Sequence, residues 1–282
     1  MSGTDPTWPG FDEAIAGPAP ETRRARRSDT RQRHQRGAGR RRGGFGGFVL
    51  GFVGVVGELL ITCGVLLLAF LGWQLWWTDV EGNREQAAVV EAGGWNDPIE
   101  QATGIVTPRY DDPPVMEQPE YLTTFASMRV PRWDGEPTRT ITQGTDRPNV
   151  LNPLGVGHYD GVAMPGGLGN FALAAHRTTY GKPFNRIAEL QPGDPIVVWT
   201  QDTWYVYRVT GSDIVMPQDV WTIAPDPQDP SVTNETATRR LITLTSCHPM
   251  FSARERYIVW GEFEYWAPTS EGIPAELEGV EL

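Results

Sequence analysis

Apolar and polar positions follow two different patterns along this chain. Between residues 45 and 77 the only charged residue is Glu58, and the run "LLITCGVLLLAFLGWQLWW" at 59–77 carries no charge. A helix of that run is roughly 28 Å long, close to the ~30 Å hydrocarbon thickness of a bilayer. Tryptophans 73, 76 and 77 end the run, where indole rings favour the membrane interface. The pattern predicts a transmembrane signal-anchor over 45–77 rather than a buried helix of a soluble protein.

From about residue 124 to 266 the pattern changes to short apolar runs separated by turn residues. The runs are "FASMRV", "TRTIT", "NFALAAH", "DPIVVWT", "TWYVYRV", "RRLITLTSC" and "RYIVWGEF". Many short strands at this spacing indicate a mainly β domain that is antiparallel and closed or nearly closed. Within it, "PIVVWTQDTWYVYRV" predicts a hairpin that turns near Gln201 and Asp202. The segment "KPFNRIAEL" at 182–190 predicts a short helix with Pro183 near its start.

The segments around these two parts are polar. Residues 23–42 carry ten arginines and one acidic residue, so 1–44 is predicted to be a disordered basic cytoplasmic tail. Residues 78–123 are rich in Pro, Gly and acids and predict a spacer, and 267–282 predict an acidic mobile tail. Because arginines precede the apolar run and acids follow it, the N-terminus is expected inside and the β domain outside the cell.

Two other interpretations of the N-terminal region fit the sequence less well. A cleaved signal peptide is disfavoured, because the basic tail is long and "QLWWTDVEG" offers no small-residue cleavage site. The arginine tail could bind nucleic acid or carry a localisation signal, but its position beside the apolar run favours a role in topology. The expected exported part, 79–282, holds 29 acidic and 14 basic residues. That negative charge makes nucleic acid an improbable partner.

Cys247 is the one cysteine of the expected exported part, because Cys63 lies within the predicted span. It follows the strand-like run 241–245, so it stands where a strand enters a loop and has no partner for an intramolecular disulfide there. His176 ends the run "NFALAA" in the same way. A histidinium beside a cysteine favours the thiolate, so the pair suggests nucleophilic catalysis. Arg256, at the start of the next strand, could hold a developing oxyanion.

Each of these residues also has a structural interpretation. A free cysteine is more often a small buried hydrophobe, a lone histidine a structural hydrogen-bonding residue, and an arginine part of a solvated face. The "GGLGN" at 166–170 is interpreted as a turn, since nothing places it between a strand and a helix as a phosphate loop requires. His158 and His248 lack partners at a ligand spacing, so no metal or cofactor is expected, although bound calcium stays open.

Two blocks of the β region together resemble the sortase family. They are "GHYDGVAMPGGLGNFALAAHRTTYGKPFNRIAELQPGD" and "LITLTSCHPMFSARERYIVWG". Sortases carry a histidine after a strand, a TLxTC-like motif and an arginine on the next strand. Here the motif has Ser246 where the family commonly has threonine. The resemblance covers residues 124–266, which it implies to be the catalytic domain.

By this resemblance Cys247 is the nucleophile, His176 the catalytic histidine and Arg256 the catalytic arginine. Arg254 is a competitor, but Arg256 directly precedes the "YIV" run, as the family arginine does. The neighbouring residues expected to contact substrate are Thr245, Ser246, Thr178 and Tyr180.

"HRTTYG" together with "TSCHP" resembles the class E sortases of high-GC Gram-positive bacteria. The resemblance implies an eight-stranded β-barrel and a housekeeping transpeptidase that attaches secreted proteins to the cell wall. Its partners would be secreted proteins with an LAxTG- or LPxTG-type sorting signal, cleaved between Thr and Gly, and an amine of the peptidoglycan precursor. A hydrolytic cysteine peptidase, a pilin-polymerising sortase and a non-catalytic envelope-binding β domain are the alternatives.

Overall fold

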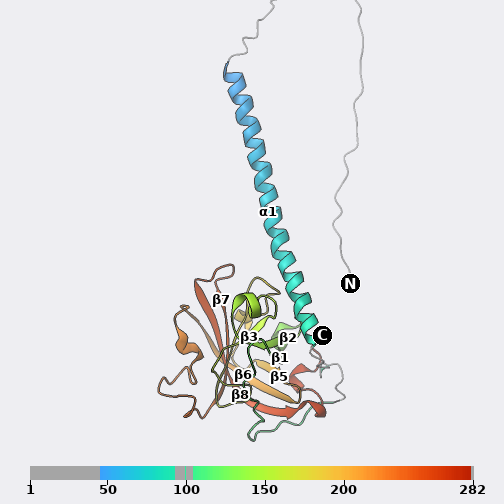
Figure 1. The fold of residues 1–282 in the computed structure, drawn as a ribbon, viewed down its shortest axis with the longest axis vertical. Helices are drawn as coiled ribbons and strands as arrows, with labels where there is room; N and C mark the ends of the chain where they lie inside the picture. The colour runs from blue at the N-terminus through green and yellow to red at the C-terminus, as the bar shows by residue number, and fades with distance from the viewer. Residues whose placement is uncertain (1–44, 93–98, 100–103, 281–282) are drawn as a thin grey trace, which may run out of the picture. The chain divides into compact units, whose positions relative to one another are not determined.

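The computed structural model describes residues 45–92, 99 and 104–280, so the predicted basic tail 1–44 lies outside the described residues. Helix α1 (Phe45–Ala92) contains the apolar run (Figure 1). By length and composition, its segment Gly47–Ala88 could cross a membrane. The helix continues past residue 77, the predicted end of the span. Residues 78–92 lack proline and contain three Glu and three Ala, residue types that favour a helix over an extended spacer.

Beyond α1, the described residues form eight strands that close into a barrel (Figure 1). The strands are β1 (Thr124–Arg129), β2 (Arg139–Gln143), β3 (Val156–His158), β4 (Gly169–Ala174), β5 (Pro195–Trp199), β6 (Thr203–Val215), β7 (Arg240–His248) and β8 (Glu255–Pro268). Around the barrel they follow the order β1-β2-β3-β4-β7-β8-β6-β5. The predicted closed eight-stranded β-barrel, preceded by a helix that could span a membrane, is confirmed.

Most neighbouring strands pair antiparallel, as expected, but two pairs do not. β5 and β6 form the predicted hairpin, in which Trp199 pairs with Trp204 and the turn contains Gln201 and Asp202. In contrast, β2 runs parallel to β3, and β4 runs parallel to β7. Alternating apolar positions report which face of a strand is buried, not the direction of its neighbour. The antiparallel expectation is therefore corrected for these two pairs.

The helix predicted over 182–190 is reduced to one 3₁₀ turn, Ile187–Glu189. Lys182 has a φ of +39°, in the left-handed region, so a right-handed helix cannot begin there. The segment 182–190 is also too short to be stable as an isolated helix. Phe184 and Ile187 are fully buried, and we attribute the local conformation to the burial of these two side chains.

Segments on both sides of the barrel strands take part in its packing. The main core contains large side chains from several strands, among them Phe171, Ile196, Tyr205, Tyr207 and Ile242. A second cluster is built on Trp199 and Trp204 and includes Val106 and Leu277. Val106 belongs to the predicted spacer and Leu277 to the predicted mobile tail, yet both are buried. Around these two residues the flanking segments pack with the barrel, because they cover its aromatic side chains.

The last turns of α1 contact the barrel through polar side chains. Asp79 pairs with Lys182, with 2.7 Å between Oδ2 and Nζ. Arg139, the first residue of β2, donates from Nη1 to Oδ1 of Asn83 at 2.9 Å and to Oε1 of Gln86 at 3.0 Å. Arg139 is buried, so these bonds supply partners that water cannot. The end of α1 thus takes part in the polar contacts of the barrel.

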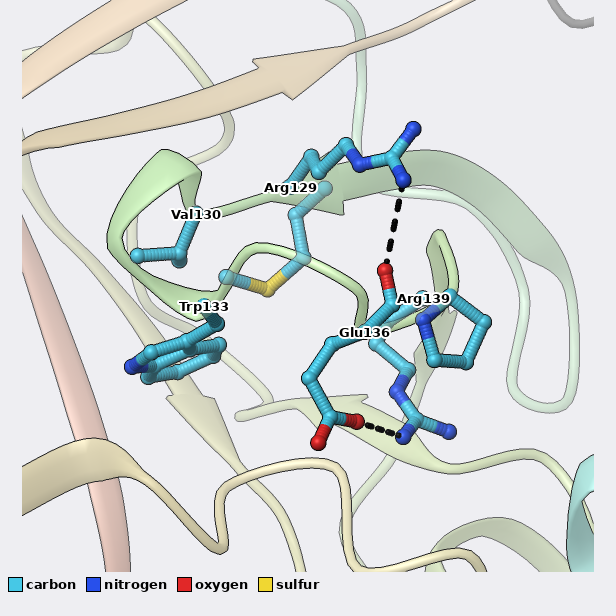
Figure 2. A pocket seen from close by; sticks show the side chains of 7 residues that line it. Arg129, Val130, Trp133, Glu136 and Arg139 are labelled. Carbon is cyan, nitrogen blue, oxygen red and sulfur yellow. Dashed lines mark hydrogen bonds and ion pairs between the residues drawn. The ribbon is translucent and has the colours of Figure 1, made fainter. Parts of the chain in front are cut away.

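A small cavity of about 10 Å³ lies between the end of β1 and the start of β2 (Figure 2). Both arginines that line it bond to Glu136. Arg129 donates from Nη2 to the carbonyl oxygen of Glu136 at 3.3 Å, and Arg139 pairs with the Glu136 carboxylate at 3.0 Å. A cavity of this size has room for about one water molecule. It offers no place for a substrate, and neither Cys247 nor His176 lines it.

Candidate active site

The pairing of β4 with β7 brings the predicted histidine and cysteine together. These strands run parallel, with Ala174 beside Thr245. Ala175 continues the ladder, because its N–H donates to the carbonyl oxygen of Thr245 at 3.2 Å. His176 lies two residues after Ala174, and Cys247 lies two residues after its partner Thr245. Since the strands run in the same direction, both residues emerge at the same edge of the barrel.

The antiparallel pairing of β7 with β8 adds the arginine. Cys247 lies directly opposite Arg256 in this ladder. Residues in such a position have Cβ atoms about 4.5–5.5 Å apart on one face of the sheet. Arg256 donates from Nη1 to the carbonyl oxygens of Ala253 and Glu255, both at 2.9 Å, which hold its guanidinium at the end of the loop. The competitor Arg254 is exposed on that loop.

All the predicted site residues line two hollows that share a wall. The first, of about 170 Å³, is lined by Cys247, His176 and Arg256 together with Thr245 and Ser246. The second, of about 480 Å³, shares Cys247 and His176 with the first and adds Thr178 and Tyr180. We call the two together the Cys247 cleft. The fold therefore collects all seven residues, which the sequence places in two separate blocks, around one thiol.

His176 is held on two sides. Its Nε2 lies 2.8 Å from Oδ1 of Asn152, and its ring centroid lies 5.2 Å from that of Tyr180. Tyr180 has a φ of +54°, a conformation that side chains other than glycine seldom adopt and that is common at functional sites. Burial lowers the pKa of His176 to about 4, and the positive charge of Arg147 contributes to the lowering. The imidazole is therefore neutral at pH 7.

Arg177, the residue after the histidine, ties the end of β4 to the end of β7. It is buried and donates from Nη1 to the carbonyl oxygen of Cys247 at 3.3 Å. The same Nη1 lies 2.8 Å from Nδ1 of His248. Its guanidinium carbon lies 5.3 Å from the ring centroid of Tyr257, a cation–π contact. A positive charge thus lies against the backbone of the cysteine and links the end of β4 to the end of β7.

The hydroxyl groups of Thr245 and Ser246 are used within the barrel. Thr245 donates from Oγ1 to the carbonyl oxygen of Leu173 at 3.0 Å, and Ser246 donates from Oγ to that of Ala175 at 2.9 Å. Both residues are buried. Leu173 belongs to β4 and Ala175 directly follows it, so both bonds join β7 to the neighbouring strand. The two hydroxyls therefore fix the alignment of β4 with β7, while substrate contact by these residues stays a prediction.

The other two histidines of the barrel domain lie in different surroundings. His158 is fully buried, with its ring nitrogens 2.7 Å from Oε1 of Gln143 and 3.0 Å from the carbonyl oxygen of Ala163. Its ring packs against Phe125 and Phe171. His248 contacts Arg177, as described above. Within the described part of the chain, no three His, Cys, Asp or Glu side chains gather as a metal site requires.

Three residues of the cleft did not emerge from the sequence. Arg147 lines both hollows, Asn152 contacts the histidine, and Arg177 supports the cysteine backbone. Arg177 had one signal, because it directly follows His176. Asn152 and Arg147 had none, because they belong to a turn between β2 and β3 whose packing partner is distant in sequence.

Known proteins that are similar to this chain are sortases. A family model described as the sortase domain matches residues 128–264. Sortase SrtE1 of Streptomyces coelicolor is 38% identical over 230 residues, which cover 79% of this chain and 60% of that protein. This chain therefore spans less than two thirds of that relative's length. Sortase SrtE2 of the same organism is 32% identical over 247 residues, covering 83% of this chain and 91% of the relative.

Solved structures give the same result. The SrtA sortase from Actinomyces oris has 44% identity and a TM-score of 0.58, covering 61% of this chain and 97% of that one. Sortase E1 from Streptomyces coelicolor, solved with a tripeptide in its active site, has 39% identity and a TM-score of 0.50, covering 55% and 96%. The chain therefore belongs to the sortase family and is similar to its class E members.

Proposed function

We propose that this protein is a membrane-anchored transpeptidase that cleaves an LAxTG- or LPxTG-type sorting signal between Thr and Gly. The family consists of cysteine transpeptidases, which supports the reaction class. The observation that carries the assignment of residues is the convergence of β4, β7 and β8. Their pairings bring His176, Cys247 and Arg256 to one cleft.

In the proposed reaction Cys247 is the nucleophile. Its sulfur attacks the carbonyl carbon of the threonine, and the tetrahedral oxyanion is stabilised by guanidinium N–H groups of Arg256. His176 takes the thiol proton and gives it to the leaving glycine amine, so that a thioester remains on Cys247. An incoming amine then attacks the thioester, loses its proton to His176, and releases the sulfur.

The electrostatics of the cleft support this division of roles. Because its pKa is lowered to about 4, His176 is unprotonated at neutral pH and able to accept the thiol proton. Arg177 donates to the carbonyl oxygen of Cys247 and so helps to hold the backbone of the nucleophile beside the histidine.

The membrane helix fits the same reaction. With the arginine-rich N-terminus inside, α1 would hold the barrel on the outer face of the membrane. The proposed substrates are secreted proteins, and the proposed acceptor is the amine of a lipid-linked peptidoglycan precursor. Confinement of enzyme and acceptor to one membrane surface raises their effective concentration for each other.

The first test removes the nucleophile. Cys247→Ala should abolish cleavage and transfer of an LAxTG- or LPxTG-type peptide, because no other thiol lines the cleft. Cys63→Ala is the matched control, since this cysteine lies in the apolar part of α1, and it should keep full activity. Incubated with peptide and no amine, the wild type should accumulate a thioester, seen by mass spectrometry on the fragment with Cys247. Turnover by Cys247→Ala, with no adduct on the wild type, would refute the proposal.

The same assay separates transfer from hydrolysis. An added amine nucleophile should convert the peptide product from the free acid to the amide. Release of the free acid alone, at every amine concentration, would support the hydrolytic alternative and contradict a transpeptidase.

A further inference from the structure

Asn152 contacts the histidine of the cleft from a turn that lies elsewhere in the sequence. Its side-chain oxygen Oδ1 is 2.8 Å from Nε2 of His176. An amide oxygen accepts hydrogen bonds and cannot donate them, so Nε2 carries the proton in this contact. The neighbouring ring of Tyr180 limits rotation of the imidazole from another side. Nδ1 is then the nitrogen left for chemistry.

The turn that carries Asn152 is fixed to the barrel. Asn152 closes the turn Arg147–Leu151, because its backbone N–H donates to the carbonyl oxygen of Arg147 at 2.9 Å. Val150 and Leu151 are buried in one cluster with Ala174 of β4, the strand that ends beside the histidine. This packing sets the position of the asparagine relative to the imidazole, so the hydrogen bond does not depend on a mobile loop.

The charge state of His176 gives this hydrogen bond a chemical consequence. With its pKa lowered to about 4, the imidazole is neutral at pH 7 and carries one proton on one of its two nitrogens. A neutral imidazole free in water exchanges between the two forms. Here the acceptor on Asn152 selects the form with the proton on Nε2, which leaves a lone pair on Nδ1.

We propose that Asn152 is a positioning residue that holds His176 in the Nε2-protonated form, so that Nδ1 exchanges the proton with Cys247. This inference rests on the proposed function. As the S–C bond to the substrate carbonyl forms, the thiol proton moves to Nδ1. Nδ1 then gives that proton to the leaving amine as the C–N bond breaks. Throughout, the Nε2–H bond to Asn152 is kept, so the transient imidazolium is oriented and stabilised.

The groups around His176 make the effect measurable. Arg147 lies on the turn before Asn152, Tyr180 lies in the loop after β4, and Cys247 and Arg256 lie on β7 and β8. No carboxylate is among the described residues that line either hollow. A carboxylate introduced at position 152 would therefore act on the imidazole with no competing anion in the cleft wall.

The kinetic test uses the full-length protein in detergent. Asn152→Ala should lower kcat on the order of 10²-fold, at the lower end of what general acid–base catalysis contributes, with KM changed less than about twofold. Asn149→Ala is the matched control, because Asn149 lies on the same turn but bonds to Asp146 and Tyr121. It should keep kcat. An equal loss in both variants, or no loss in Asn152→Ala, would overturn the proposal.

A second measurement needs no substrate. In full-length protein with ¹⁵N-labelled histidine, long-range ¹H–¹⁵N spectra should show the proton of His176 on Nε2, and His176→Gln assigns the signal. Asn152→Ala should shift the population toward the Nδ1-protonated form. If the wild type shows Nδ1–H, the inference is wrong even when the protein is an active transpeptidase. If Nε2–H is found and lost as expected but no peptide is cleaved, the proposed function fails on its own.

The pH profile tests whether the side chain of residue 152 contacts the imidazole. Asn152→Asp keeps an acceptor for Nε2–H but adds a negative charge, which should raise the pKa of His176 by about 1–3 units. The acid limb of kcat/KM, expected near pH 4 in the wild type, should move to higher pH by the same amount. An acid limb that stays near pH 4 in Asn152→Asp would show that the side chain of residue 152 does not contact Nε2 of His176, and would contradict the proposal.

Discussion

Arg256 and Arg254 are two residues apart in the chain but lie in different surroundings. Arg256 lines the cleft opposite Cys247, and Arg254 is exposed on the loop. Arg256→Lys should lower kcat/KM on the order of 10²-fold, because an ammonium cannot replace a planar fork of donors at an oxyanion. The melting temperature should stay near that of the wild type, since the side chain is only half-buried.

Arg254→Lys is the control for this substitution. It makes the same change, arginine to lysine, at an exposed position outside the cleft. We therefore expect kcat/KM to change less than about twofold. Peptide cleavage measured over a range of substrate concentrations gives both values. The reverse ranking of the two variants would mean that the catalytic arginine is assigned to the wrong position.

At the scale of elements, a Gly→Ala substitution near the end of α1 should lower stability, whereas the same substitution in an exposed helix usually raises it. A Cβ added at Gly82 would lie 2.7 Å from the carbonyl carbon of Tyr180. Gly→Ala in an exposed helix stabilises by about 0.5–1 kcal/mol, because alanine loses less backbone entropy. At Gly82 the clash with backbone should reverse that sign and destabilise by about 1–3 kcal/mol.

The control is Gly72→Ala on the same helix, where an added Cβ meets no atom within 4 Å. Thermal unfolding of the full-length proteins in detergent, followed by near-UV circular dichroism of the barrel, compares the two. A higher melting temperature in Gly82→Ala would show that α1 does not pack against the Tyr180 loop.

At the scale of the whole molecule, buried histidines make stability depend on pH. Burial lowers the pKa of His158 to about 4, and an unfolded chain returns it to about 6.5. Between these values the unfolded chain binds more protons, so the free energy of unfolding falls as the pH drops. For His158 alone the loss approaches about 3 kcal/mol once the pH is below 4. His176 acts in the same direction.

The measurement is urea unfolding of the wild type and of His158→Gln at pH 7.5 and pH 4.5. The variant loses some stability at both values, because it breaks the contacts with Gln143 and Ala163. Its difference between the two pH values should nevertheless be smaller than that of the wild type. Equal differences would show that His158 is not buried as a neutral ring.

The sequence by itself determined the parts of this protein that depend on local pattern. The apolar run predicted a membrane-spanning helix. The short apolar runs of 124–266 predicted seven of the eight barrel strands, all but β3, and the hairpin at Gln201 and Asp202. The strand and helix predictions depend on the period of buried positions, which is readable within a few residues. The assignment of Cys247, His176 and Arg256 rests on two motifs and on their resemblance to the sortase family.

Only the tertiary structure decided how the separate segments meet. The parallel pairing of β4 with β7 brings His176 and Cys247 to the same edge of the barrel. The two residues of each pair in this ladder, such as Ala174 and Thr245, are 71 positions apart in the sequence. Nothing in the turn at 147–152 marks Asn152 as a partner of the histidine, and nothing in 104–106 or 275–277 marks Val106 and Leu277 as buried. Such roles come from contacts between segments that are distant in sequence. The free energy gained when two such segments bury each other depends on both of them, so the local pattern of either one does not predict it.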